Sequence, residues 1–128
     1  MKKVKTVSKQ APEAIGPYSQ AIQAGDLIFT SGQISLDPAT GEIVSADIKE
    51  QTRQAMENLK NVLLAGGSDL DMVIKTTVFI KNMADFAAIN EVYGTFFKDD
   101  PPARSCVEVS ALPKGALIEV EAVALIKK

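Results

Sequence analysis

The chain has 128 residues, of which 46% are apolar and 23% charged, as is typical of a single globular domain. A net charge of −2 argues against a nucleic-acid-binding surface, because such surfaces are usually basic. The sequence contains no histidine and one cysteine, which excludes histidine-based hydrolase triads and leaves no ligand set for zinc. No apolar run is long enough to cross a bilayer, so we expect a soluble, cytoplasmic protein.

Short strands are expected before the first helix. Alternating and β-branched residues predict strands at 4–7, 19–24 and 27–34, the last two joined by a Gly25-Asp26 turn. The segment 37–42 contains Asp-Pro and Thr-Gly pairs, which are typical of a loop.

The first helix is the clearest element of the sequence. Apolar residues recur at helical spacing between Ile48 and Leu63, with charged residues on the other face, as in an amphipathic helix. Asp47 is the expected N-cap, with Glu50 as its capping-box partner, and the Gly66-Gly67 pair is expected to end the helix.

A strand and a second helix follow. The segment 72–81 is predicted to be a strand with four residues on one side, Ile74, Thr76, Val78 and Ile80. A helix is expected from about 84 to 97, capped by Asn82 or Asp85. Its apolar stripe would consist of Phe86, Ile89, Tyr93 and Phe96.

Two strands, at about 104–109 and 117–126, close the chain around a Pro113-Lys114-Gly115 turn. The order of elements predicts one α+β domain over residues 1–128. Its two helices can cover only one face of the sheet.

The other face of the sheet is predicted to mix large apolar residues with a few charges. Leu27 and Phe29 line one side of an early strand, and Glu119, Glu121, Val123 and Leu125 line one side of the last strand. Such a mixed face is more typical of a subunit interface than of a solvated surface. We therefore expect a homo-oligomer whose sheets face one another.

Arg104 and Glu119 are the candidate reactive residues, and we expect them to share a sheet face. The planar guanidinium of Arg104 suits a carboxylate ligand because it donates two parallel hydrogen bonds. The alternative for Arg104 is a structural salt bridge to Glu108, Glu119 or Glu121 across the subunit interface. The alternative for Glu119 is an ordinary solvated or paired strand carboxylate.

Four further positions have weaker signals. Tyr18 either anchors the N-terminal loop or lines a pocket. Gly32 follows Ser31 within a predicted strand, which indicates a bulge or a close backbone approach. Asn90 lies inside a helix and suggests a hydrogen-bonding role, with capping or exposure as the alternative. Cys106 is expected to be a small buried residue.

Several segments together resemble the Rid (YjgF) family, in particular its RidA branch. The matching segments are Ala14-Ile15-Gly16-Pro17-Tyr18-Ser19-Gln20-Ala21, Thr30-Ser31-Gly32-Gln33-Ile34, Val73-Ile74-Lys75-Thr76-Thr77-Val78-Phe79-Ile80, Pro102-Ala103-Arg104-Ser105-Cys106-Val107-Glu108-Val109 and Ile118-Glu119-Val120-Glu121-Ala122. They occur in the family's order over nearly the full length. The block around Arg104 is the most specific of them.

The resemblance implies a chorismate-mutase-like α+β fold, a homotrimer and active sites between subunits. It implies hydrolysis of 2-enamino and 2-imino acids to 2-oxo acids and ammonia, without cofactor or metal. Arg104 would bind the substrate carboxylate and Glu119 would position or activate water. The rest of the pocket would be formed by Tyr18, Ser31, Gly32, Asn90 and Cys106.

Two other functions remain open. A regulatory module that senses a small carboxylate would use Arg104 without requiring Glu119. Ribonuclease activity or inhibition of translation is less favoured, because the chain is acidic and lacks a basic or aromatic stripe for RNA.

Overall fold

The computed structural model describes residues 2–128. Six strands follow one another across a mixed sheet in the order β1-β2-β3-β7-β5-β6, and β4 pairs with β7 beside this path. The strands are β1 (Lys3–Thr6), β2 (Ala21–Ala24), β3 (Leu27–Thr30), β4 (Gln33–Ile34), β5 (Val73–Ile80), β6 (Ala103–Glu108) and β7 (Ile118–Leu125). Only β5 and β6 pair in parallel.

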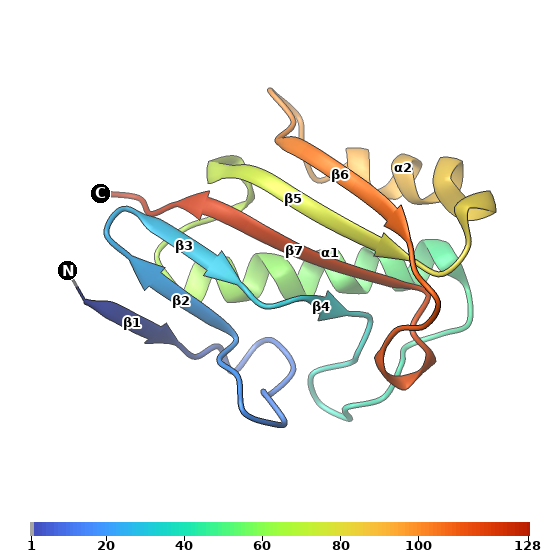
Figure 1. Ribbon diagram of the computed structural model, residues 1–128, viewed down its shortest axis with the longest axis horizontal. Coiled ribbons are helices and arrows are strands. Elements are labelled where there is room, and N and C mark those ends of the chain that lie inside the picture. Colours follow the sequence, from blue (N-terminus) through green and yellow to red (C-terminus); the bar gives the residue numbers. More distant parts are fainter. Residues whose placement is uncertain (1) are drawn as a thin grey trace.

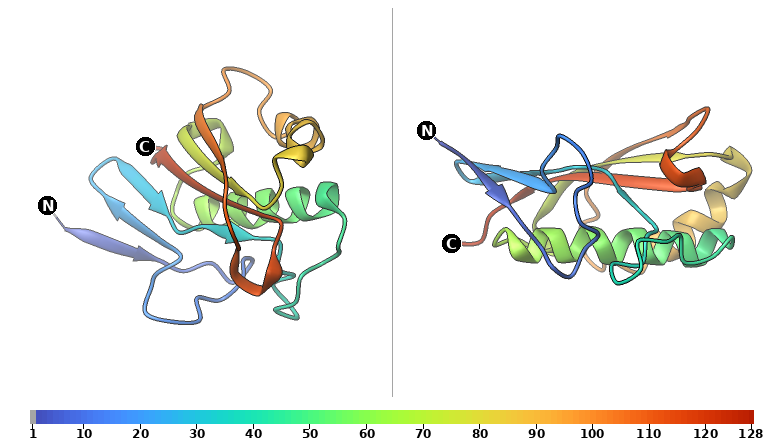
Figure 2. Two further views of the ribbon diagram at one scale, coloured as in Figure 1. Left: turned by 45° about the vertical axis from the view of Figure 1, so that its right-hand side comes forward. Right: turned by 90° about the horizontal axis from the view of Figure 1, so that it is seen from below.

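Both α-helices cover the same face of the sheet (Figures 1 and 2). They are α1 (Ile48–Ala65) and α2 (Phe86–Gly94), and short 3₁₀ turns occur at Leu70–Met72, Met83–Asp85 and Pro113–Gly115. The right-hand view of Figure 2 shows the helices on one side and the sheet on the other. The predicted arrangement of a mixed sheet with two helices on one face is therefore confirmed.

The core lies between the sheet and the helices. The largest side chains that α1 buries there are Met56, Leu59 and Leu63, each 0% exposed, and the central strand β7 buries Ile118, Val120, Ala122 and Ala124. Alternation along β7 therefore points the intervening residues, including Glu119, toward the uncovered face.

The predicted N-cap and C-cap of α1 are confirmed, but the predicted capping box is not formed, because the Asp47 amide donates to the Ser45 hydroxyl at 2.9 Å rather than to the Glu50 side chain. The Asp47 carboxylate accepts a hydrogen bond from the Glu50 backbone amide at 3.0 Å, and Gly66 is the C-cap. The Gly66 amide donates to the carbonyls of Val62 and Leu63 at the end of the helix. These interactions are local, so the sequence alone identifies them.

Other predicted boundaries were wrong. The single strand predicted over 27–34 is interrupted after Thr30, and β4 begins at Gln33. Ile74 is 44% exposed, because the pairing of β5 with β7 shifts register between Val73 and Lys75. A shift of one residue turns a side chain to the other face of the sheet.

The predicted stripe and caps of the second helix also need correction. Ile89 and Tyr93 are buried, but Phe86 is 37% exposed and lies near the edge of the core. Neither Asn82 nor Asp85 makes a side-chain capping hydrogen bond. A 3₁₀ turn, Met83–Asp85, precedes α2, and its first backbone amide, that of Met83, binds the Glu108 carboxylate at 2.7 Å.

Candidate functional site

The side chain of Arg104 in β6 extends toward α2, where three residues of α2 contact its guanidinium. Its Nη1 donates a hydrogen bond of 2.7 Å to Oδ1 of Asn90. Its Cζ lies 5.4 Å from the centre of the Phe86 ring and 4.9 Å from that of Tyr93. The two rings are within the range at which cation–π attraction is significant. The group is therefore held by one neutral acceptor and two aromatic rings.

Helical spacing explains why these residues meet at one point. Phe86, Asn90 and Tyr93 are separated by four and three positions, so they share one face of α2. The Tyr93 hydroxyl forms a hydrogen bond of 2.7 Å with the fully buried hydroxyl of Thr76 in β5. Thr76 pairs directly with Arg104 across the β5–β6 ladder.

No salt bridge occupies Arg104 within residues 2–128. Glu108, one of the three partners considered for it, instead accepts a hydrogen bond from the backbone of Met83. Asn90 is the acceptor that the structure gives to the guanidinium. Within residues 2–128 the guanidinium therefore retains N–H groups for a ligand. The alternative salt bridge would form across a subunit interface, with a carboxylate of a second copy of the chain.

Cys106 lies two residues from Arg104 on the same side of β6 and packs against the core. Burial raises the pKa of its thiol, and the nearby Arg104 charge only partly opposes this effect. A raised pKa favours the protonated thiol over the reactive thiolate. Cys106 was expected to be buried, but it is only partly buried where it packs against the core.

Glu119 lies elsewhere, in a pocket of about 240 Å³ beside the N-terminal loop. Tyr18 and Gly32 line the same pocket, together with apolar residues that include Ile15 and Ile34. Ile34 is the cross-strand neighbour of Glu119 in the β4–β7 pair. The pocket therefore brings together three of the predicted site residues.

Glu119 approaches the backbone of Gly32 closely. A Cβ built on Gly32 would lie 2.6 Å from Cδ and 2.9 Å from Oε2 of Glu119. Real Cβ atoms do not approach other atoms this closely, so a side chain at position 32 would displace the carboxylate. The prediction of a close backbone approach at this glycine is confirmed.

Two features of its surroundings make the Glu119 carboxyl group less acidic than usual. Partial burial raises the pKa of its carboxyl group, and the negative charge of Glu121 on the same side of β7 raises it further. Both effects disfavour the ionised form.

Arg104 and Glu119 lie on opposite faces of the sheet, and the predicted shared face is wrong. Arg104 is paired with Thr76, which is fully buried beneath the helices. Glu119 is paired with Phe79, three residues further along the same strand. Since side chains alternate along β5, Thr76 and Phe79 point to opposite faces. The two candidate groups of one chain cannot hold one small ligand between them.

Ser31 and Tyr18 depend on the N-terminal loop. The Ser31 hydroxyl donates to the carbonyl of Ser19 at 2.6 Å, and its amide donates to the carbonyl of Gln20 at 2.9 Å. Tyr18 is 52% exposed. Backbone and hydroxyl groups therefore tie the segment before Gly32 to the segment after Tyr18.

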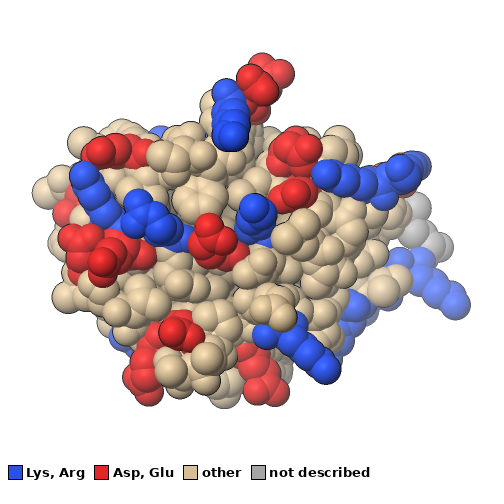
Figure 3. Space-filling view, turned by 180° about the vertical axis from the view of Figure 1, so that it is seen from behind, with Lys and Arg blue, Asp and Glu red and all other residues tan. Residues whose placement is uncertain are grey.

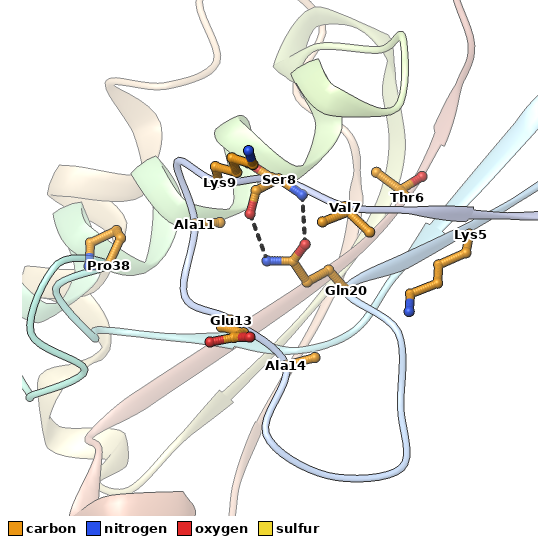
Figure 4. A pocket seen from close by; sticks show the side chains of 10 residues that line it. All are labelled: Lys5, Thr6, Val7, Ser8, Lys9, Ala11, Glu13, Ala14, Gln20 and Pro38. Carbon is orange, nitrogen blue, oxygen red and sulfur yellow. Dashed lines mark hydrogen bonds between the residues drawn. The ribbon is translucent and has the colours of Figure 1, made fainter.

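Gln20 holds this loop closed, and the sequence did not reveal that role. Its side-chain amide accepts from the Ser8 amide at 2.7 Å and donates to the carbonyls of Ser8 and Pro12. Figure 4 shows the two bonds to Ser8 in a second pocket, of about 440 Å³. Gln20 and Glu13 line both pockets, so the loop forms a shared wall.

Phe86 and Tyr93 were also missed as neighbours of Arg104. Each was assigned to the apolar stripe of its helix. Their spacing of seven residues, with Asn90 between them, was the available signal, because it predicts one shared helical face. Which strand that face meets depends on the tertiary structure.

Other kinds of site find little support in the described part of the chain. Residues 2–128 contain no cluster of three or more potential metal ligands, and none of their helices combines the length and hydropathy needed to span a membrane. Lysine, arginine and acidic side chains are interspersed on the helical side in Figure 3. That side therefore has no single-sign patch suited to nucleic acid.

Comparison with known proteins identifies the family. The family model described as endoribonuclease L-PSP, which represents the YjgF/Rid proteins, matches residues 8–126. The chain belongs to the Rid family. A RutC family protein of Pyrococcus horikoshii is 58% identical over 117 residues, covering 91% of this chain and 93% of the relative.

Two further members of the Rid family are informative. The mouse 2-iminobutanoate/2-iminopropanoate deaminase is 46% identical over 125 residues, covering 98% of this chain and 92% of the relative. The crystal structure of Escherichia coli TdcF with bound serine matches with a TM-score of 0.92 and 46% identity, covering 97% of this chain and 99% of TdcF. The Rid-type fold expected from the sequence is therefore confirmed.

Proposed function

We propose that this Rid protein hydrolyses reactive 2-enamino and 2-imino acids, such as 2-iminobutanoate and 2-iminopropanoate, to 2-oxo acids and ammonia. The observation that carries the proposal is the Arg104 guanidinium, which lacks a carboxylate partner within its own chain. The names of the mouse and human relatives, 46% and 47% identical, supply the reaction. The serine bound to TdcF carries a carboxylate of the kind that an arginine fork recognises.

The proposed site is completed by two copies of the chain. Arg104, Asn90 and Cys106 form one half on the helical side of β6, and Tyr18, Gly32 and Glu119 form the other half at the opposite face. Because the halves cannot meet within one chain, a ligand that touches both needs a second copy. We propose that this copy belongs to a homotrimer in which the uncovered sheet faces meet.

The uncovered face has the composition expected of such an interface. Its exposed apolar residues include Phe29, Val107 and Leu125, which are 44%, 43% and 40% exposed. Phe29 pairs with Val123, and Leu27 pairs with Leu125, so apolar side chains adjoin across β3 and β7. A contiguous apolar face of this kind supports contact with another protein surface.

The chemistry requires few protein groups. Arg104 of one copy would bind the substrate carboxylate and fix the distance between the imine carbon and a water molecule. Glu119 of another copy would take a proton from that water as its oxygen attacks the imine carbon. The attacked species is the iminium ion, so the product is a neutral carbinolamine, which would receive the proton from Glu119 on its nitrogen. The C–N bond would then break as the hydroxyl group gives its proton back to Glu119, which leaves the 2-oxo acid. Transfer of that proton to the departing ammonia would restore the ionised Glu119 and release ammonium.

The raised pKa of Glu119 suits the second part of this cycle, since a less acidic carboxyl group retains a proton until the amine departs. Attack by water requires the ionised form. A neighbouring guanidinium supplied by another copy would favour that form. Assembly would therefore lower the pKa of Glu119 relative to that in the isolated chain.

The proposal is tested by trapping the intermediate that the enzyme would consume. Threonine and a threonine dehydratase generate the imine in the presence of semicarbazide, and the semicarbazone is followed by its absorbance. The purified wild-type protein should suppress trapping, and undiminished trapping would overturn the proposal. Arg104→Ala should lose roughly a hundredfold or more in kcat/KM because the fork that binds the substrate carboxylate is removed. Arg104→Lys should also fail badly, because a point charge cannot replace the fork.

Arg53→Ala provides the matched control for the loss of a cation. Arg53 is exposed on α1 and away from both halves of the site. This variant should suppress semicarbazone formation as well as the wild type does. A comparable loss in both variants would assign the Arg104 effect to net charge rather than to substrate binding.

A non-catalytic, carboxylate-sensing module is the second candidate, and the serine bound to TdcF is the observation that favours it. Glu119→Gln separates the two functions. Under the catalytic proposal this variant should slow turnover more than it weakens binding of 2-oxobutanoate. A sensing module would show no turnover in the wild type and unchanged ligand affinity in the variant.

A further inference from the structure

The guanidinium of Arg104 has an aromatic environment that carboxylate binding alone does not demand. Phe86 and Tyr93 place their ring centres 5.4 and 4.9 Å from Cζ of Arg104. An arginine side chain has several rotatable bonds, so an unsupported fork would lose considerable conformational freedom on binding a ligand. Contacts that restrict it beforehand reduce that cost.

We infer that Phe86 and Tyr93 are positioning residues, which hold the Arg104 fork in the orientation that receives the substrate carboxylate. This inference rests on the proposed function for the identity of the ligand. The two rings lie on the same face of α2, with Asn90 between them in the sequence. Together with the Asn90 hydrogen bond they restrain the guanidinium by three contacts from one helix.

Contacts with Thr76 and Phe97 hold the Tyr93 ring in place. Its hydroxyl shares a hydrogen bond of 2.7 Å with Thr76, which is 0% exposed, and its ring packs against Phe97 at 4.9 Å between centres. Within residues 2–128, Phe86 makes no comparable ring–ring contact, and it is 37% exposed. Tyr93 should therefore restrain the guanidinium more strongly than Phe86.

Asn90 determines which edge of the fork remains available. It accepts from Nη1, so Nε and Nη2 keep their N–H groups for an incoming ligand. These two nitrogens form an edge that can donate two parallel hydrogen bonds to one carboxylate. The aromatic contacts involve the π faces of the rings and consume none of these donors.

The test compares Tyr93→Leu, Phe86→Leu and Tyr93→Phe with Phe96→Leu. Phe96 follows α2 and packs against the core, and the described cation–π contacts of Arg104 do not include it. It controls for the general cost of replacing a phenylalanine. KM and kcat are measured in the trapping assay, and the dissociation constant of 2-oxobutanoate is measured by calorimetry.

Removal of the Tyr93 ring should raise KM and the 2-oxobutanoate dissociation constant by roughly tenfold, with a smaller change in kcat. Phe86→Leu should raise both constants by about threefold. Tyr93→Phe retains the ring and should change both by no more than about twofold, whereas Phe96→Leu should leave them unchanged. Equal constants in wild type and Tyr93→Leu would overturn the inference.

A spectroscopic measurement separates this inference from the proposed reaction. In the ligand-free wild type, ring currents should shift the Nε–Hε proton resonance of Arg104, and Tyr93→Leu should remove most of that shift. An unshifted wild-type resonance would overturn the aromatic contact whatever the enzyme does. An active wild type with unaltered Tyr93→Leu kinetics would overturn the positioning role and leave the deaminase proposal standing.

Discussion

At the scale of single residues, Gly32 determines where the Glu119 carboxylate lies. The side chain of Glu119 occupies the space that a Cβ at position 32 would fill. The glycine also separates β3 from β4, so Ser31 and Gly32 leave the sheet beside β7. Because Gly32 carries no side chain, the Glu119 carboxylate can lie directly against its backbone in the pocket.

Gly32→Ala should reduce kcat/KM by about tenfold or more, because a displacement of the carboxylate by about 1 Å impairs proton transfer. The effect on KM should be smaller, since Arg104 remains in place. Steady-state kinetics in the trapping assay measure both constants. Gly94→Ala is the control: a Cβ there meets nothing within 4 Å, so activity should persist. Equal activity of the two variants would contradict the role given to Gly32.

The sequence was sufficient to select the candidate residues but not to place them on faces. Arg104 was chosen because its guanidinium suits a small acid, and Glu119 because its segment resembles the Rid family. Neither choice needs the tertiary structure. Their placement depends on the register of β5 against both β6 and β7, which non-local pairing determines. Phe86 and Tyr93 were assigned only to an apolar helical stripe, because their contact with Arg104 likewise depends on non-local packing.

At the scale of elements, α1 supports the wall of the Glu119 pocket through buried polar side chains. Nδ2 of Asn58 donates to the carbonyls of Ile34 and Leu36 at 3.0 and 2.8 Å. Oε1 of Gln51 accepts from the Ser35 hydroxyl and from the Leu117 amide. A strand of two residues has few ladder bonds of its own, so α1 supplies partners for the adjoining backbone.

Asn58→Leu should lower the free energy of unfolding by about 1–3 kcal/mol, because the Leu36 carbonyl loses its buried donor. Asn61→Leu is the control one turn away on α1, where the side chain donates an exposed hydrogen bond to Gln10. It should change stability by no more than about 0.5 kcal/mol. Urea denaturation measures both. A similar small change in the two variants would show that Asn58 does not support β4.

The elements differ in how far local sequence defines them. The helix α1 was predictable with both its caps, since its apolar period and its capping residues lie within one segment. The interruption between β3 and β4 was not, because it arises where Glu119 of a distant strand approaches Gly32. Asn58 and Gln51 likewise gain their roles only when α1 meets β4 and β7.

At the scale of the whole molecule, the two faces of the sheet divide the proposed site into halves. The helical face holds Arg104, and the uncovered face holds Glu119 beside exposed apolar residues. Assembly through the uncovered faces would bury those residues and bring a second chain to the pocket. Catalysis and association would then depend on the same surface.

The most direct test of this account is activity in mixed assemblies. Arg104→Ala and Glu119→Gln chains are co-expressed with different tags, and assemblies that contain both are purified through the two tags in succession. Each parent variant alone should be nearly inactive in the trapping assay. Every mixed trimer would contain one site with an intact Arg104 and an intact Glu119, so we expect about one third of wild-type activity. Mixed assemblies as inactive as their parents would contradict a site shared between chains.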